Sequence, residues 1–152
     1  MRTALLGLAC LAGCYPTTTR PDLVPVPDAS RLEVELFVPE ATRALALALD
    51  VDSIPVVRTE PDDGWLTTDW FDAATLGPVS GRPLGLDAVR VRAFVDPARP
   101  NHSLIQVEVV YRAVADPARP PRDLEMMVPV GHPVRERVQR ALERLREEYG
   151  ER

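Results

Sequence analysis

The chain has 152 residues, a formal net charge of −5, and 18 basic residues, all of which are arginine. This length suits one domain of ordinary size with one modest core. An acidic balance without a cluster of basic residues argues against nucleic acid as a partner.

The chain begins with a short apolar leader. Met1 and Arg2 supply a positive start, and the run from 3 to 13 is rich in Ala, Leu and Gly. This run is too short to cross a bilayer as a helix, so it predicts a signal peptide over residues 1–13. It ends in Leu-Ala-Gly-Cys at positions 11–14, which resembles the lipobox of bacterial lipoproteins.

The lipobox resemblance implies a covalent lipid anchor on Cys14. In such proteins the cysteine sulfur carries a diacylglycerol, the chain is cleaved before the cysteine, and the new amino group receives an acyl chain such as palmitate. Several acyl chains hold a protein durably on a membrane, whereas one alone holds it marginally. The next residue is Tyr15, and the familiar sorting rule retains lipoproteins at the inner membrane when aspartate stands there. The resemblance therefore implies the outer membrane; a plain secretory signal with an incidental cysteine is the alternative.

Cleavage before Cys14 also removes Cys10, so the mature chain would have no thiol. The sequence therefore predicts no disulfide and no cysteine metal site.

Residues 14–30 follow as the lipidated cysteine and a Pro/Thr-rich sequence with no helical or strand period. Such a composition predicts an extended, solvated tether between the lipid and the domain. A segment that lies on a partner is the alternative, because Leu23, Val24 and Val26 are more apolar than a spacer requires.

A single α+β domain is expected over residues 31–152. Alternation over 31–38 predicts a half-buried strand, and the Ala/Leu composition of 41–49 favours a helix. Further strands are expected at 56–59, 65–71, 88–95, 103–114 and 124–130. Apolar residues at helical spacing over 133–149 predict a long C-terminal helix. This order predicts an antiparallel sheet packed against the C-terminal helix, which is the helix-grip arrangement.

Residues suited to catalysis or metal binding are sparse. His102 and His132 lie in loop-like sequence without a second ligand at metal spacing. No nucleophile stands beside a base, and the acidic run 60–63 is typical of a solvated turn. The sequence therefore predicts no enzyme, no metal site and no cofactor other than the lipid on Cys14.

The best candidate for a binding surface is aromatic. Trp65 and Trp70 lie within six residues of each other, and on one strand they would face opposite sides of a sheet. An exposed tryptophan is a common interface anchor, and burial under the following loop is the alternative. Asp69 must point outward or find an arginine such as Arg90 or Arg92. The candidate interface residues are therefore Trp65, Asp69 and Trp70.

The chain resembles lipoproteins with a BamC-like domain in three features. These are the segment Gly64 to Trp70 (GWLTTDW), the arginine-bearing stretch 89–94 and the closing helix. That family includes the accessory lipoprotein C of the outer-membrane β-barrel assembly machinery, and this chain has room for one such domain. The resemblance implies a helix-grip fold, envelope proteins as partners and no catalytic residues.

Two functions are open at this stage. The first is a non-enzymatic outer-membrane lipoprotein, anchored by lipid, whose periplasm-facing domain binds other envelope proteins in outer-membrane assembly. The second is a carrier or sensor that holds a small apolar ligand between helix and sheet. A filled core would favour the first function, and a hollow core the second.

Overall fold

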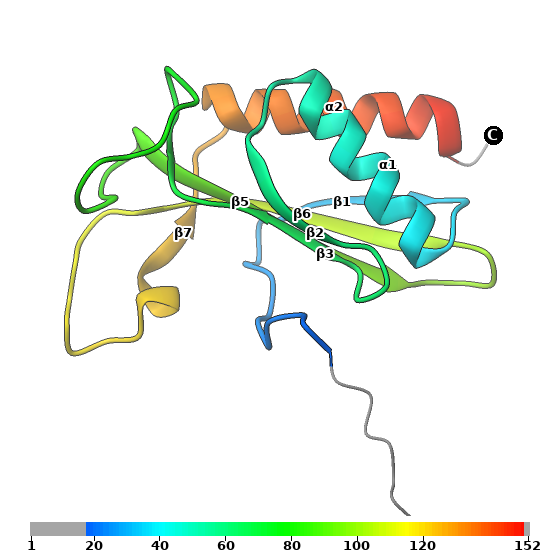
Figure 1. The fold of residues 1–152 in the computed structure, drawn as a ribbon, viewed down its shortest axis with the longest axis horizontal. Helices are drawn as coiled ribbons and strands as arrows, with labels where there is room; N and C mark the ends of the chain where they lie inside the picture. Colours follow the sequence, from blue (N-terminus) through cyan, green and yellow to red (C-terminus); the bar gives the residue numbers. More distant parts are fainter. Residues whose placement is uncertain (1–17, 151–152) are drawn as a thin grey trace, which may run out of the picture.

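The computed structural model describes residues 18–150 (Figure 1). The predicted leader, Cys14 and the first residues of the tether lie outside the described residues. The elements in chain order are β1 (Ser30–Val34), α1 (Val38–Val51), β2 (Val56–Glu60), β3 (Trp65–Thr68), β4 (Phe71–Asp72), β5 (Ala88–Pro97), β6 (Ser103–Arg112), the 3-10 helix η1 (Pro121–Leu124), β7 (Glu125–Met127) and α2 (Pro133–Tyr149).

Within this range, seven antiparallel strands form the sheet, in the order β1-β6-β5-β3-β2. The short strands β4 and β7 pair with β5 and β6. The hairpin of β5 and β6 forms the centre, and α1 and α2 both lie across one face of the sheet (Figure 1). The predicted α+β class, with an antiparallel sheet packed against a C-terminal helix, is confirmed.

The main core lies between the two helices and the sheet. Alternate residues of β5 and β6, such as Val91, Val107 and Val109, point toward the helices and are fully buried. The buried stripe of α2 includes Leu142 and packs into the same cluster as Leu45 of α1. The spacing of apolar residues therefore determines which side of each element faces the core.

The two helices are joined at the carboxyl end of α1. Asp52 follows α1, and its carboxylate receives Arg140 Nε at 3.1 Å and the guanidinium of Arg144. Arg137 donates to the backbone carbonyl of Asp52 at 2.9 Å. Because the carboxyl end of a helix carries partial negative charge, these arginines of α2 stabilise it and align the two helices.

The predicted strand over 65–71 is shorter in the structure. It ends at Thr68, and Phe71–Asp72 pairs separately with β5. A turn at Gly64 precedes β3, with a positive φ of 65°, and a Cβ there would clash with the carbonyl oxygen of Val95. Glycine therefore allows the close approach that brings Trp65 onto the sheet.

The N-terminal segment differs from the expected solvated tether. Residues 18–29 lie against the face of the sheet opposite the helices, which we call the back face (Figure 1). This face carries Trp65, Arg92, Phe94 and Glu108, all of them buried. The sheet is therefore covered by helices on one face and, in part, by its own N-terminal segment on the other.

Candidate functional site

Trp65 is part of the back-face core. Only 5% of the residue is exposed, its indole N–H donates to the hydroxyl of Thr19 at 3.3 Å, and the guanidinium of Arg58 lies 4.9 Å from its ring. These contacts make Trp65 a structural residue and remove it from the candidate interface.

Trp70 is partly exposed and lies beyond the end of β3, so the two tryptophans do not share one strand. The guanidinium groups of Arg90 and Arg112 lie 5.2 Å and 4.6 Å from its ring. Arg90 Nη2 also approaches Asp69 Oδ1 to 4.0 Å, so the predicted partner Arg90 is confirmed. We call the surface formed by Asp69, Trp70, Arg90 and Arg112 the Trp70 site.

The Trp70 site has an excess of positive charge. The Nε atoms of Arg90 and Arg112 are buried and have no hydrogen-bond partner among residues 18–150. Burial lowers the pKa of the Arg90 guanidinium below its ordinary value, and the positive charge of nearby Arg92 lowers this pKa further. Asp69 is a weak counter-charge because its side chain is 81% exposed. Because the Nε atoms themselves are buried, an anionic group would have to meet the other nitrogens of these two partly exposed arginines.

A small apolar groove adjoins the Trp70 site. It has a volume of about 180 Å³ and is lined by Pro55, Val57, Asp69, Trp70, Phe71, Leu76 and Pro78. Val57 is 58% exposed and stands at the irregularity in the pairing of β2 with β3. Trp70 thus belongs both to an apolar groove and to a positively charged cluster.

A buried ion cluster, which the sequence analysis did not identify, lies next to the Trp70 site. Arg92 Nη1 lies 2.7 Å from Glu108 Oε1 and 2.7 Å from Glu125 Oε2. Arg122 Nη1 binds the same two carboxylate oxygens at 2.6 Å and 2.9 Å. Glu108 is fully buried. Two arginines and two glutamates therefore balance their charges in a site where only Arg122 has substantial exposure, and we call this site the ion cluster.

The ion cluster also holds the N-terminal segment. The backbone N–H of Val26 donates to Glu108 Oε2 at 3.0 Å, and Arg122 Nη2 donates to the carbonyl oxygen of Val24 at 2.5 Å. These bonds leave the charged atoms of the cluster with additional partners, which the burial of charge requires.

The start of the segment is held farther along the sheet. Arg20 forms an ion pair with Asp96 at 2.7 Å and lies 5.2 Å from the ring of Phe94. The backbone N–H of Thr19 donates to Asp63 Oδ2 at 2.6 Å. The segment is therefore fixed at both of its ends.

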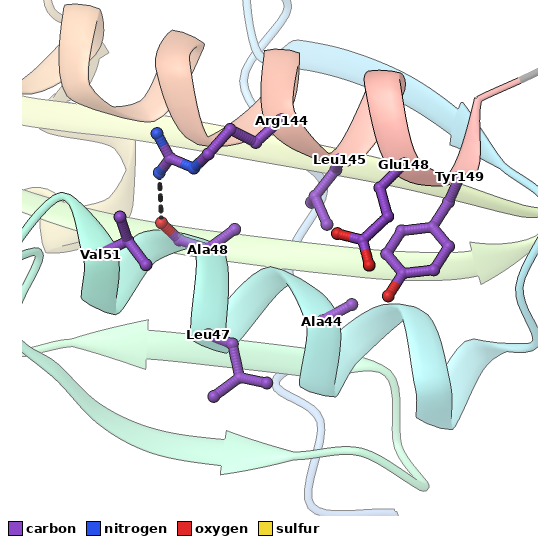
Figure 2. A pocket seen from close by; sticks show the side chains of 8 residues that line it. All are labelled: Ala44, Leu47, Ala48, Val51, Arg144, Leu145, Glu148 and Tyr149. Carbon is purple, nitrogen blue, oxygen red and sulfur yellow. Dashed lines mark hydrogen bonds between the residues drawn. The ribbon is translucent and has the colours of Figure 1, made fainter.

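A second groove lies between the two helices on their outer side (Figure 2). It has a volume of about 260 Å³, and Leu47 and Val51 of α1 are each 70% exposed beside it. Arg144 on its rim donates to the carbonyl oxygen of Ala48 at 2.8 Å, the dashed line in Figure 2. Its arginine is thus already paired, and the rest of the lining is mostly apolar.

The histidines have structural contacts. His132 Nδ1 accepts from the N–H of Val134 at 3.3 Å and caps α2, while Nε2 lies 3.0 Å from the carbonyl oxygen of Leu86. His102 Nδ1 lies 2.9 Å from the carbonyl oxygen of Pro100. Over the described part of the chain, His, Cys, Asp and Glu form no group of three or more that could hold a metal ion.

No protein-family model matches the chain, and no curated protein matches it in sequence. The resemblance to BamC-like lipoproteins therefore stays a prediction from one phrase and the order of elements.

The ion cluster predicts how stability depends on pH. Burial alone would raise the pKa of Glu125, but the hydrogen bonds and charges of Arg92 and then Arg122 hold this pKa below its ordinary value. A carboxylate with a lowered pKa stabilises the folded state above its unfolded pKa of about 4.3, and this contribution is lost as the pH falls through the folded pKa.

We expect Glu125→Gln to lower the free energy of unfolding by about 3 kcal/mol at pH 7, because it leaves buried arginine charge less well paired. The difference from the wild type should narrow as the pH falls from about 4.3 toward the lower folded pKa of Glu125, because the unfolded wild-type chain takes up the proton first. Urea unfolding at pH 7 and at lower pH measures both effects, with the exposed Glu143→Gln as the control. Equal stability of Glu125→Gln and wild type at pH 7 would contradict the role of the cluster.

Proposed function

We propose that the chain is a lipid-anchored outer-membrane lipoprotein without catalytic activity, whose periplasm-facing domain binds other envelope proteins as an accessory module in outer-membrane assembly. The observation that carries this proposal is the docking of residues 19–26 on the back face, which ties the domain closely to the proposed anchor at Cys14.

Docking shortens the distance between the lipid and the domain. Five residue steps separate Cys14 from Thr19, so even a fully extended chain spans at most about 18 Å. A tether that reached Ser30 would span up to about 55 Å. A lipidated Cys14 would therefore keep the domain beside the membrane, and this position suits a protein that binds other components of the same membrane.

The packing of the core supports an interaction module over a carrier. The strand side chains beneath the helices, including Val91, Val107 and Val109, are fully buried. The grooves at the Trp70 site and between the helices are open at the surface, and neither is lined by these side chains. An apolar ligand would have to displace packed side chains, which is costly in a close-packed interior.

The Trp70 site is the surface that supports recognition of a partner. It combines a partly exposed tryptophan, two arginines and an apolar groove, and tryptophan and arginine are the residues most often responsible for binding energy at interfaces. The BamC-like resemblance is consistent with partners among envelope proteins.

Among residues 18–150, no helix has the length and apolar character needed to cross a membrane.

Cys14→Ala tests the anchor. We expect the variant to become soluble or to remain unprocessed, because it has no sulfur to lipidate. Fractionation of cell envelopes after a high-salt wash measures this, and Cys10→Ala is the matched control that should stay with the outer membrane. Retention of Cys14→Ala on the membrane would contradict the proposal.

Site-specific crosslinking tests the interaction surface in cells. A photo-reactive residue in place of Val57, beside the Trp70 site, should form crosslinks to outer-membrane proteins. The same residue in place of Leu47, which is similarly exposed on α1, should form few. Equal crosslinking at the two positions, or none at Val57, would contradict the assignment of the partner surface.

A further inference from the structure

We propose that the Trp70 site binds a peptide segment of a partner protein that presents a carboxylate next to a large apolar side chain. The carboxylate would lie against the guanidinium groups of Arg112 and Arg90, and the apolar side chain would enter the groove beside Trp70. This inference rests on the proposed function, because it names the chemistry of the partner at that site.

The charges of the site call for an anion. Arg90 and Arg112 stack on one indole ring, and each has a buried Nε without a hydrogen-bond partner in the range 18–150. The acidic neighbour Glu125 is already bound by Arg92 and Arg122. The exposed Asp69 reaches only Arg90, at 4.0 Å. Arg112 therefore has no ion pair with any described residue, and the two Nη groups of its planar guanidinium can donate two parallel hydrogen bonds to a carboxylate.

The groove selects the rest of the ligand. Its volume of about 180 Å³ is below the range of about 300–1,000 Å³ that accommodates drug-sized molecules. Apart from the exposed Asp69, its lining is apolar and suits a single apolar side chain: Pro55, Val57, Trp70, Phe71, Leu76 and Pro78. An apolar groove beside two cations therefore fits a short acidic and apolar sequence, and fits a bare inorganic anion less well.

The peptide would be recognised mainly by side chains of the Trp70 site, and less by backbone hydrogen bonds to an edge strand. β2 is the edge strand beside the groove, so a strand added on this side of the sheet would pair with β2. The register of β2 shifts between Val56 and Arg58, which interrupts the regular ladder at Val57. Such irregularities protect edge strands from pairing with other chains, so the peptide is expected to bind across the groove by its side chains.

The chain offers its own reporter, because it contains two tryptophans. Full-length lipidated protein in detergent, labelled with 15N at tryptophan, gives two indole N–H signals, and Trp70→Phe assigns them. Trp65 is buried and bonded to Thr19, so its signal reports whether each variant is folded. The probes are a capped pentapeptide with leucine between two glutamates, the same peptide with glutamines in place of the glutamates, and inorganic phosphate.

We expect the glutamate peptide to shift the Trp70 signal saturably while the Trp65 signal stays in place. The glutamine peptide should bind at least about tenfold more weakly, which corresponds to one charge-assisted hydrogen bond. Arg112→Gln should weaken the glutamate peptide by a similar factor, whereas Arg43→Gln, which removes an exposed arginine of α1, should leave binding unchanged. If the Arg112→Gln variant loses the Trp65 signal, it is not folded, and the Arg112→Lys variant is tested in its place. Arg112→Lys should bind the glutamate peptide more weakly than the wild type.

Equal binding of the two peptides, or no effect of Arg112→Gln in a folded chain, would overturn the proposal. Phosphate that binds as tightly as the glutamate peptide would also overturn it, since the site would then be a simple anion site. Because this experiment uses purified protein, its outcome is independent of the membrane fractionation of Cys14→Ala. A failure of the anchoring proposal can thus be told apart from a failure of the peptide proposal.

Discussion

The pairing of the buried Arg92 and the partly buried Arg122 with two glutamates is the interaction on which the rest of the structure depends. The four residues come from four elements: Arg92 from β5, Glu108 from β6, Glu125 from β7 and Arg122 from η1. The cluster therefore connects the central hairpin of β5 and β6 to η1 and β7. Removing one partner of a buried ion pair costs about 3–5 kcal/mol, because the remaining charge stays desolvated. The cluster therefore requires all four side chains together. Glu108 and Arg122 also form hydrogen bonds with the backbone of the N-terminal segment, at Val26 and Val24.

This constraint gives the sheet two chemically different faces. The helix face is apolar and filled, whereas the back face carries the ion cluster, with the docked segment over Phe94 on one side and the Trp70 site on the other. Arg90 and Arg92 lie two positions apart on β5, on the same face. The positive charge of Arg92 is balanced by glutamates, while that of Arg112 is balanced by no ion pair with a described residue. The back face thus holds the N-terminal segment and leaves the cationic Trp70 site without a close carboxylate at Arg112.

The sequence predicts the helices and strands whose apolar residues have a clear period. It does not predict contacts between residues that are far apart in the chain. α2, β5 and β6 were predicted from apolar spacing, and the α+β class follows from their order. The segment at Val24 and Val26 has no period, and its partners Arg122 and Glu108 lie 98 and 82 residues away in the chain. The candidate residues Asp69 and Trp70 were found from composition and from the need to pair a charge. The sequence does not tell which of the two tryptophans is exposed, because the N-terminal segment that covers Trp65 is distant in the chain.

The docking of that segment by the ion cluster is tested most directly by hydrogen exchange at the amide of Val26 in the full-length chain. Our account predicts that this amide exchanges slowly, because it donates to the buried Glu108 carboxylate. Arg122→Gln should accelerate its exchange much more than that of Val107 in the centre of β6. Exchange of the Val26 amide at the rate of an unfolded chain in the wild type would contradict the account, since the segment would then be the solvated tether that its composition predicts.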